Sequence, residues 1–351
     1  MRRRLTGALA AIGGLGILIT GCGGGGNPGS PQGTHSAQAA VAAKTVRLIQ
    51  GGGLDFSDAA IFRAMALLKQ RGYDVTLDNV ADPTTALRSV LAGKADVYLG
   101  DPVEAATAVA NSGAQLKYLA SIAQTSDYEV LAAPRFTLSD LAGARLATAG
   151  PGTAGQIVAV AALRKDGVNV SQIHQVTVGG TSARVTALLS GQVDLAPVLA
   201  PSAAAAVATG KVKILVNAGQ VLGDYLQQGL IASSAFAAET ATAQATVDAF
   251  LDAERWATSN ESAFISLATA NNLLSGLTPT EAKTAWSQLL AGHYFATNGA
   301  ICTEAIDATL SYAYQSGGGL TRSSTPKLSD WVDPAYVNAY LTQHGQPAGS
   351  C

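Results

Sequence analysis

A repeat spaced by 98 residues constrains the fold of this chain more than any other sequence feature. Residues 86–97 and 187–195 both read as a helix end, a glycine and a short apolar strand. Gly93 and Gly191 lie 98 positions apart, and so do Asp96 and Asp194. The repeats of solenoid proteins are much shorter, about 20 to 50 residues. The spacing therefore predicts two similar α/β lobes.

Strand-like runs alternate with helix-like blocks along the chain. In the first half we expect strands at 44–50, 75–77, 95–99 and 116–122. We expect helices at 59–71 and 83–92, and a third that ends at residue 111. This alternation is typical of an α/β fold whose mostly parallel sheet is flanked by helices. Ligands of such sheets bind beyond the carboxyl ends of the strands, which here places binding residues at 50–58, at 100–101 and at their later counterparts.

Two turns in the second half have the composition of a ligand socket. Residues 149–155 (Ala-Gly-Pro-Gly-Thr-Ala-Gly) follow the expected strand 145–148, and residues 179–182 (Gly-Gly-Thr-Ser) follow the expected strand 174–178. A helix begins after each turn, and its first backbone N–H groups carry partial positive charge. We predict ligand contacts at Gly152, Thr153, Thr181 and Ser182. The alternative for the last two is a capping role that needs no ligand.

The first of these turns also matches G-x-G-x-x-G, the pattern of dinucleotide-binding turns. In such sites an acidic residue at the end of the next strand binds the ribose. Here that strand ends in Val178-Gly179-Gly180, and Asp166 falls in a turn at a helix end. We therefore interpret the turn as a ligand-facing helix start and expect no cofactor.

Acidic side chains gather near the expected binding edge of the first lobe: Asp55, Asp58, Asp101 and Glu104. They are either solvated loop acids, favourable at helix starts, or part of a cleft. In a cleft they disfavour a bare anion and favour a ligand with an amino or ring N–H group. We predict ligand contacts at Asp58 and Asp101.

Further candidate contacts are two aromatic residues, a leucine and an arginine. Phe56 and Tyr128 are placed to stack on a ligand, although Tyr128 has the alternative of packing at a hinge. Leu199 is also predicted as a contact. Arg184 is the only arginine beside a proposed second-lobe turn. It would help to bind a sulfonate, or it faces solvent from its helix.

The composition excludes several classes of function. The formal net charge is −2, and without Arg2, Arg3 and Arg4 the chain has 19 basic against 24 acidic residues. No basic patch is present, which argues against nucleic-acid binding. The four histidines lack the spacing of metal ligands, so we expect no metal. No G-x-S-x-G, C-x-x-C or H-E-x-x-H motif occurs, and we expect no enzyme activity.

The first residues have the form of an export signal. Three arginines precede the apolar run 5–20, which is short for a membrane span. The run ends in Ile19-Thr20-Gly21-Cys22, which resembles a bacterial lipobox, so residues 1–21 are a predicted signal peptide and Cys22 a predicted lipidation site. The alternative is an ordinary secretory leader, and both the Sec and Tat routes stay open. The Gly- and Pro-rich residues 22–43 are a predicted flexible tether.

The remaining two cysteines are Cys302 and Cys351. An even number of cysteines in an exported chain permits a disulfide bond. The alternative is two unpaired thiols.

A family resemblance rests on the motif Leu188-Leu189-Ser190-Gly191-Gln192-Val193-Asp194, which follows Asp140-Leu141-Ala142-Gly143-Ala144-Arg145-Leu146-Ala147. With the Trp331-Val332-Asp333-Pro334 segment and its following helix, it resembles the nitrate, sulfonate, taurine and thiamine-precursor group of ABC-importer substrate-binding proteins. The resemblance covers about residues 45–341.

This resemblance implies a two-lobed periplasmic-binding-protein type II fold. The first lobe would comprise residues 44–133, the second 134–217, and residues 218–344 would return to the first lobe and add helices, before a tail at 345–351. The expected added helices are 240–258, 261–271, 278–291, 303–315 and 335–341.

The resemblance also implies a function. We expect a monomer, lipid-anchored to the outer face of the cytoplasmic membrane, that passes a small solute to an ABC permease. A sulfonate or taurine-like solute and a thiamine-pyrimidine-like solute are alternatives, and so are riboflavin, nitrate and bicarbonate. An enzyme or a sensor on the same fold is the alternative class.

Overall fold

The structure is a computed structural model that describes residues 44–274 and 276–344, all within one compact unit. The predicted signal peptide, the tether with Cys22, and Cys351 lie outside the described residues. Cys302 takes part in a disulfide bond, but its pairing with Cys351 stays a prediction. None of the helices in the described part is both long and apolar enough to span a membrane.

Two five-stranded sheets share one strand order. The first sheet runs β2-β1-β3-β10-β4 and the second runs β7-β6-β8-β5-β9. The strands of the first are β1 (Thr45–Gly51), β2 (Asp74–Val80), β3 (Val97–Gly100), β4 (Leu116–Thr125) and β10 (Asp224–Ser233). Those of the second are β5 (Tyr128–Ala132), β6 (Arg145–Thr148), β7 (His174–Thr177), β8 (Leu195–Leu199) and β9 (Lys213–Asn217). The repeat predicted from the spacing of 98 residues is therefore a repeat of topology.

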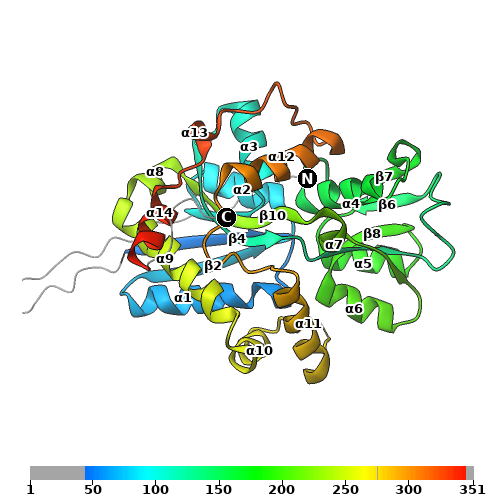
Figure 1. Cartoon of the computed structure of the whole chain (residues 1–351), viewed down its shortest axis with the longest axis horizontal. Coiled ribbons are helices and arrows are strands. Elements are labelled where there is room, and N and C mark those ends of the chain that lie inside the picture. Colours follow the sequence, from blue (N-terminus) through cyan, green and yellow to red (C-terminus); the bar gives the residue numbers. More distant parts are fainter. Residues whose placement is uncertain (1–43, 275, 345–351) are drawn as a thin grey trace, which may run out of the picture. The chain divides into compact units, whose positions relative to one another are not determined.

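Each sheet is parallel except for one inserted strand. In the first sheet β1 pairs in parallel with β2 and β3, while β10 pairs antiparallel with β3 and β4. In the second sheet β6 pairs in parallel with β7 and β8, while β5 pairs antiparallel with β8 and β9. The predicted mostly parallel α/β architecture is confirmed. Figure 1 shows the two sheets with their flanking helices.

Helices flank both sheets. Three belong to the first half of the chain: α1 (Ala59–Gln70), α2 (Pro83–Leu91) and α3 (Pro102–Ser112). Four belong to the second sheet: α4 (Ala154–Lys165), α5 (Thr181–Leu189), α6 (Ala200–Ala208) and α7 (Ala218–Leu222). The C-terminal part adds α8 (Ser234–Ala238), α9 (Thr240–Ala257), α10 (Glu261–Ala270), α11 (Pro279–Ala291), α12 (Thr303–Ser316), α13 (Leu328–Trp331) and α14 (Ala335–Gln343). Two 3₁₀ turns, η1 (Phe56–Asp58) and η2 (Val170–Gln172), complete the set.

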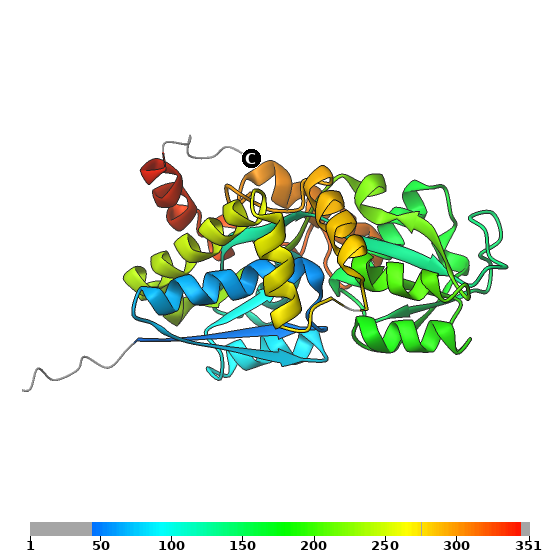
Figure 2. The same ribbon diagram turned by 90° about the horizontal axis from the view of Figure 1, so that it is seen from below.

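The C-terminal helices complete the first lobe. Helix α9 packs along α1, and α14 packs on α9 and β4; Figure 2 shows α1 in blue beside α9. Helix α12 contacts both β10 and α4, so it touches both lobes. The predicted extra helices on the first lobe are therefore confirmed. Helix α12 also contacts the second lobe, which was not predicted.

The lobe boundaries differ from the predicted ones at 133 and 217. Strand β5 was assigned to the first lobe as a crossing, but it pairs with β8 and β9 of the second sheet. Helix α7 lies beyond the predicted return point, yet it packs on α4, β5 and β9. The chain crosses as extended strands that join the sheet they enter, so the second lobe comprises residues 128–222. The first lobe comprises residues 44–125 and 224–344.

An arginine–aspartate contact is repeated in the two lobes. Asp96 Oδ2 accepts hydrogen bonds from the backbone N (2.8 Å) and Nε (3.1 Å) of Arg47. Asp194 Oδ2 accepts the same pair from Arg145, both at 2.9 Å. Each arginine also donates to the carbonyl of the repeated glycine, Gly93 or Gly191. The repeated residues thus tie β1 to the turn before β3 in the first lobe, and β6 to the turn before β8 in the second.

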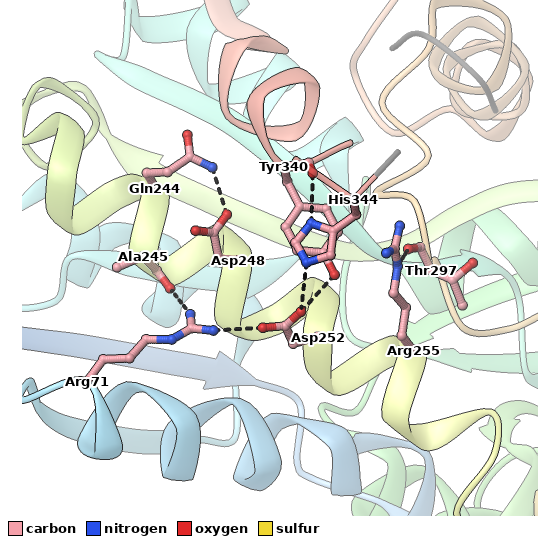
Figure 3. Close-up of polar contacts among 9 residues, drawn as sticks. All are labelled: Arg71, Gln244, Ala245, Asp248, Asp252, Arg255, Thr297, Tyr340 and His344. Carbon is pink, nitrogen blue, oxygen red and sulfur yellow. Dashed lines mark hydrogen bonds and ion pairs between the residues drawn. The ribbon is translucent and has the colours of Figure 1, made fainter. Parts of the chain in front are cut away.

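A polar cluster fastens the last helix to the first lobe (Figure 3). Asp252 of α9 accepts hydrogen bonds from Arg71 (2.7 Å) and from the Tyr340 hydroxyl (2.8 Å). The ring of His344 stacks on Tyr340 at 4.0 Å between centroids. The guanidinium of Arg255 lies over the ring of Tyr340, 4.7 Å from the ring centroid. These contacts join α1, α9 and α14 at the surface, away from the gap between the lobes.

We predict that Asp194→Asn lowers the free energy of unfolding by about 1–2 kcal/mol. The substitution removes charge-assisted hydrogen bonds, and the partial exposure of Arg145 limits their strength. Hydrogen bonds from Arg145 hold the pKa of Asp194 below its ordinary range, so the carboxylate stabilises the fold above about pH 4 and this contribution is lost as the pH falls through the lowered pKa. Chemical denaturation at pH 7 and pH 3.5 measures the difference.

Asp140→Asn is the matched control, because Asp140 is exposed in the same lobe. Equal stability of Asp194→Asn and the control at pH 7 would contradict the role assigned to the repeated contact.

Candidate ligand-binding cleft

A cavity lies between the two lobes at the carboxyl ends of the parallel strands. It encloses about 620 Å³ of empty space, including its open mouth. The first lobe contributes the end of β1 and the turn after it (Gln50–Gly53), parts of η1, the end of β3, the start of α3, two residues of β10 and Tyr294. The second lobe contributes Tyr128, the turn 149–155 in part, Thr181, Arg184 and Leu199. This is the location expected for ligands of open α/β sheets.

Six of the nine predicted contact residues line this cavity: Asp58, Asp101, Tyr128, Thr153, Thr181 and Leu199. These residues lie at or after the ends of strands of the two sheets, and they come together because both sheets have the carboxyl ends of their parallel strands at the same gap. Their contact with a ligand stays a prediction.

The prediction for Phe56 is wrong. Its side chain is fully buried in the first-lobe core, where its ring meets that of Phe264 edge-on at 5.2 Å between centroids. The short turn η1 points Ser57 and Asp58 toward the cavity and Phe56 into the apolar core. A position within a binding loop therefore did not determine the direction of the side chain.

Gly152 and Ser182 do not line the cavity either. Gly152 has φ +79°, and a Cβ there would lie 2.9 Å from the carbonyl oxygen of Gly318. The glycine thus permits a close approach of main chains from the two lobes. Ser182 is exposed. The N-cap of α5 is Gly180, with no capping side-chain hydrogen bond, so the alternative capping role of Thr181 and Ser182 is also not realised.

The first-lobe wall is acidic. Asp58 Oδ1 accepts from Gln228 Nε2 at 3.1 Å and Asp58 Oδ2 accepts from the backbone N of Asp55 at 2.8 Å. Burial raises the pKa of Asp58 to about 7, against these lowering hydrogen bonds. No basic side chain of the first lobe lies among the described residues that line the cavity, so this carboxyl lacks a positive partner.

Two further carboxyls belong to the same wall. Asp101 Oδ1 accepts from the backbone N of Val103 at 2.7 Å, and its Oδ2 accepts from the Tyr225 hydroxyl. Glu104 Oε2 accepts from the Tyr98 hydroxyl at 2.5 Å. Burial raises the pKa of Asp101 to about 7, and burial together with the Asp101 charge raises that of Glu104 to about 8. The sequence indicated this acidic group, but not that it is buried.

The second-lobe wall carries a buried cation. Arg184 is 2% exposed, so it does not face solvent from its helix. It donates to the carbonyl oxygens of Pro197 (2.9 Å) and Gly179 (2.7 Å) and to the Thr181 hydroxyl (3.1 Å). Burial lowers the pKa of its guanidinium, while the neighbouring Tyr128 raises it. In the described part of the chain no carboxylate forms an ion pair with Arg184.

Direct contacts close the lobes around the cavity. The Ser202 hydroxyl of α6 donates to Asp55 Oδ2 across the gap at 2.6 Å. Gln156 Nε2 donates to the carbonyl oxygen of Ser316 at 2.8 Å. The backbone N of Thr181 donates to Gly52 O at 3.3 Å. The structure therefore has the lobes in contact at several points around the rim.

Sequence reasoning included Gln50 in the binding segment 50–58 but missed other lining residues: Tyr98, Gln227, Gln228 and Tyr294. Gln227 and Gln228 stand together inside the buried strand β10, and a pair of amides in an apolar strand is a signal that could have been used. Tyr294 lies in a connection of the C-terminal part, where no pattern pointed to the cleft.

A family model matches residues 66–262, more than half of the chain, and describes proteins that are NMT1/THI5 like. The chain belongs to the NMT1/THI5-like family. No curated protein matches the sequence. The matched residues run from α1 to the start of α10 and include the whole second lobe.

Solved structures share the fold of this NMT1/THI5-like chain. A protein of Bordetella bronchiseptica RB50 is 21% identical with a TM-score of 0.71, over 86% of this chain and 98% of that one. The alkanesulfonate-binding protein SsuA from Xanthomonas axonopodis pv. citri, bound to MOPS, is 20% identical with a TM-score of 0.63, over 84% and 100%. The desulfurization enzyme DszB is 16% identical with a TM-score of 0.56, over 86% and 99%. At these identities the likeness concerns the fold.

We predict that Glu104→Gln makes the protein less sensitive to alkaline pH. The folded state keeps the proton of Glu104 up to about pH 8, whereas the unfolded chain loses it near pH 4.5. The free energy of unfolding therefore falls as the pH rises between these values. Glutamine has no proton to lose, so the variant should melt higher relative to the natural protein at pH 9 than at pH 5. Thermal melts across this range measure the difference.

The exposed Asp166, replaced by asparagine, provides the control. A melting difference between Glu104→Gln and the natural protein that is constant from pH 5 to pH 9 would show that Glu104 does not hold its proton.

Proposed function

We propose that this protein captures a small organic solute outside the cytoplasm and delivers it to an ABC permease. The observation that carries the proposal is the cavity between the lobes, whose polar lining comes from both of them. Membership of the NMT1/THI5-like family supports it, and so does the fold shared with an alkanesulfonate-binding protein. The solute is of the sulfonate or taurine-like class or of the thiamine-pyrimidine-like class.

Capture would proceed by closure of the lobes on the solute. A solute that touches both walls stabilises the closed arrangement, because its contacts to both lobes at once exist only there. The rim contacts Ser202–Asp55 and Gln156–Ser316 form at the same time. The permease would recognise the surface that the closed form presents.

The N-terminal segment supports a membrane-attached form of this function. Acylation of Cys22 followed by the tether 22–43 would hold a monomeric binding domain near the permease on the outer face of the cytoplasmic membrane. Two lobes with their own cavity need no second chain.

The described cavity lining offers little for an enzyme. Its aliphatic hydroxyl groups belong to Ser57, Thr153 and Thr181, and none of the described lining residues is a histidine or a cysteine. A serine or cysteine nucleophile paired with a histidine base is therefore not present among these residues. The fold shared with DszB does not change this proposal, because the residues of the site decide the chemistry.

We predict that one solute class raises the melting temperature of the soluble protein, prepared without its leader and with Cys22→Ser. A ligand at 100 times its Kd stabilises a protein by about 2.7 kcal/mol, which corresponds to several degrees for a chain of this size. A melt screen with alkanesulfonates, taurine, hydroxymethylpyrimidine, riboflavin, nitrate and bicarbonate tests this. The absence of stabilisation, together with no co-purified ligand in native mass spectrometry, would contradict the binding function.

We predict that Ser202→Ala weakens solute binding about fivefold. The substitution removes the hydrogen bond to Asp55, which forms only when the lobes close, and one such bond contributes about 1 kcal/mol. Calorimetric titration with the stabilising solute measures the affinity. Ser182→Ala is the control in the same lobe, since Ser182 is exposed and away from the cavity; equal affinity of the two variants would contradict the rim contact's role.

A further inference from the structure

We propose that the solute is a zwitterion, with its anionic group at Arg184 and its cationic nitrogen at the carboxyls of Asp58, Asp101 and Glu104. This inference rests on the proposed capture function and narrows the class of solute. It follows from the placement of unlike charges on opposite walls of one cavity.

The second-lobe wall is suited to an anion. A guanidinium has five N–H donors, and Arg184 uses three of them in hydrogen bonds to uncharged oxygens. The cost of burying an unpaired cation is large unless an anion compensates it. The first residues of α4, Ala154 and Gly155, line the same wall, and the N–H groups of a helix start add partial positive charge. All these groups favour a carboxylate, sulfonate or phosphonate at this end.

The first-lobe wall is suited to a cation. Three carboxyls line it, and their hydrogen bonds come from uncharged groups: backbone N–H groups, an amide and tyrosine hydroxyls. Arg184, on the opposite wall, is the only basic side chain among the described residues around the cavity. Burial raises the pKa of each carboxyl, and a cation beside them would favour their charged form. An ammonium group would supply it.

The two walls do not neutralise each other. In the described residues, none of the three carboxyls forms an ion pair with Arg184. The central carbon of the Arg184 guanidinium lies 6.0 Å from the centroid of the Tyr128 ring. The charge of Glu104, on the other wall, contributes to raising the pKa of Tyr128. Tyr128, a neutral side chain, thus lies near charged groups of both walls, and a solute that bridges the walls would contact both.

A solute with only one charge would meet a mismatch. A simple anion placed at Arg184 would lie in a cavity with three carboxyls, and a simple cation would leave Arg184 uncompensated. Specificity arises when the wrong partner leaves a buried charge unpaired. The cavity should therefore prefer zwitterions to analogues that lack either charge.

Calorimetric titration with a matched panel tests this preference. The probes are aminoalkane sulfonates and amino acids with two to four carbons between the charges, their hydroxy analogues without the amine, and the corresponding amino alcohols without the acid. We expect at least one zwitterion to bind ten or more times tighter than both of its analogues. A hydroxy analogue or an amino alcohol that binds as tightly as its zwitterion would overturn the inference.

Variants locate the two charges. Arg184→Gln should remove the preference for the zwitterion over the amino alcohol that lacks the acid. The double variant Asp58→Asn, Glu104→Gln should remove the preference for the zwitterion over the hydroxy analogue that lacks the amine. Arg164→Gln and Asp140→Asn, both at exposed positions, should leave both ratios unchanged. Melting curves check that each variant folds. Titration of the natural protein with the same panel tests the preference for zwitterions without any substitution. Unchanged ratios in folded cavity variants would overturn the placement of the charges.

A second measurement separates this inference from the proposed function. The soluble protein is incubated with an acid extract of bacterial metabolites, desalted and examined by native mass spectrometry. A bound zwitterion agrees with both proposals. A bound solute that lacks either charge would overturn the inference and leave the capture function standing. No bound species here and no binder in the panel would overturn both.

Discussion

The site depends on a carboxylate contact that is repeated in the two lobes, where it ties β1 to the turn before β3 and β6 to the turn before β8. In both lobes one aspartate accepts hydrogen bonds from the backbone and side chain of an arginine, Arg47 within β1 or Arg145 at the start of β6. The contact sets the parallel alignment of strands whose far ends carry the binding turns. Because it lies at the opposite end of the sheet from the cavity, it is free to be the same in both lobes while the turns differ.

The difference between the turns is largely one of charge. After their strands, the first lobe places carboxyls and the second places glycines, hydroxyls and a buried guanidinium. The same topology thus presents an acidic wall and a basic wall to one space. Because the two walls belong to different lobes, the carboxyls and the guanidinium stay apart. Within one lobe they would form ion pairs with each other, and no charged group would be left to bind a solute.

Much of the fold was predictable from local patterns. The alternation of strands and helices and the spacing of 98 residues between Asp96 and Asp194 indicated two lobes of the same construction, and Arg47 and Arg145 share that spacing. The boundaries were not predictable in this way, because β5 looks the same as a strand whichever sheet it joins. Only its pairing with β8 and β9 decides the lobe.

The site was predictable to the level of the turn but not of the side chain. Asp58 and Phe56 lie two residues apart, and the 3₁₀ turn sends one to the cavity and the other to the core. The burial of Arg184 depends on acceptors at Pro197 in strand β8 and at Gly179 in the turn after β7. Hydrogen-bond partners from other elements cannot be predicted from the periodicity of a single helix.

Two pairs of glycines set how near the lobes come. A Cβ on Gly180 would lie 2.6 Å from Gly52 O, and a Cβ on Gly318 would lie 2.6 Å from the Cα of Gly152. Main chain therefore meets main chain at the rim, and the closed separation is independent of the side chains around the cavity. Lining residues can change to suit another solute while the outer surface of the closed form stays the same. A single docking partner could in this way serve relatives that carry different cargo.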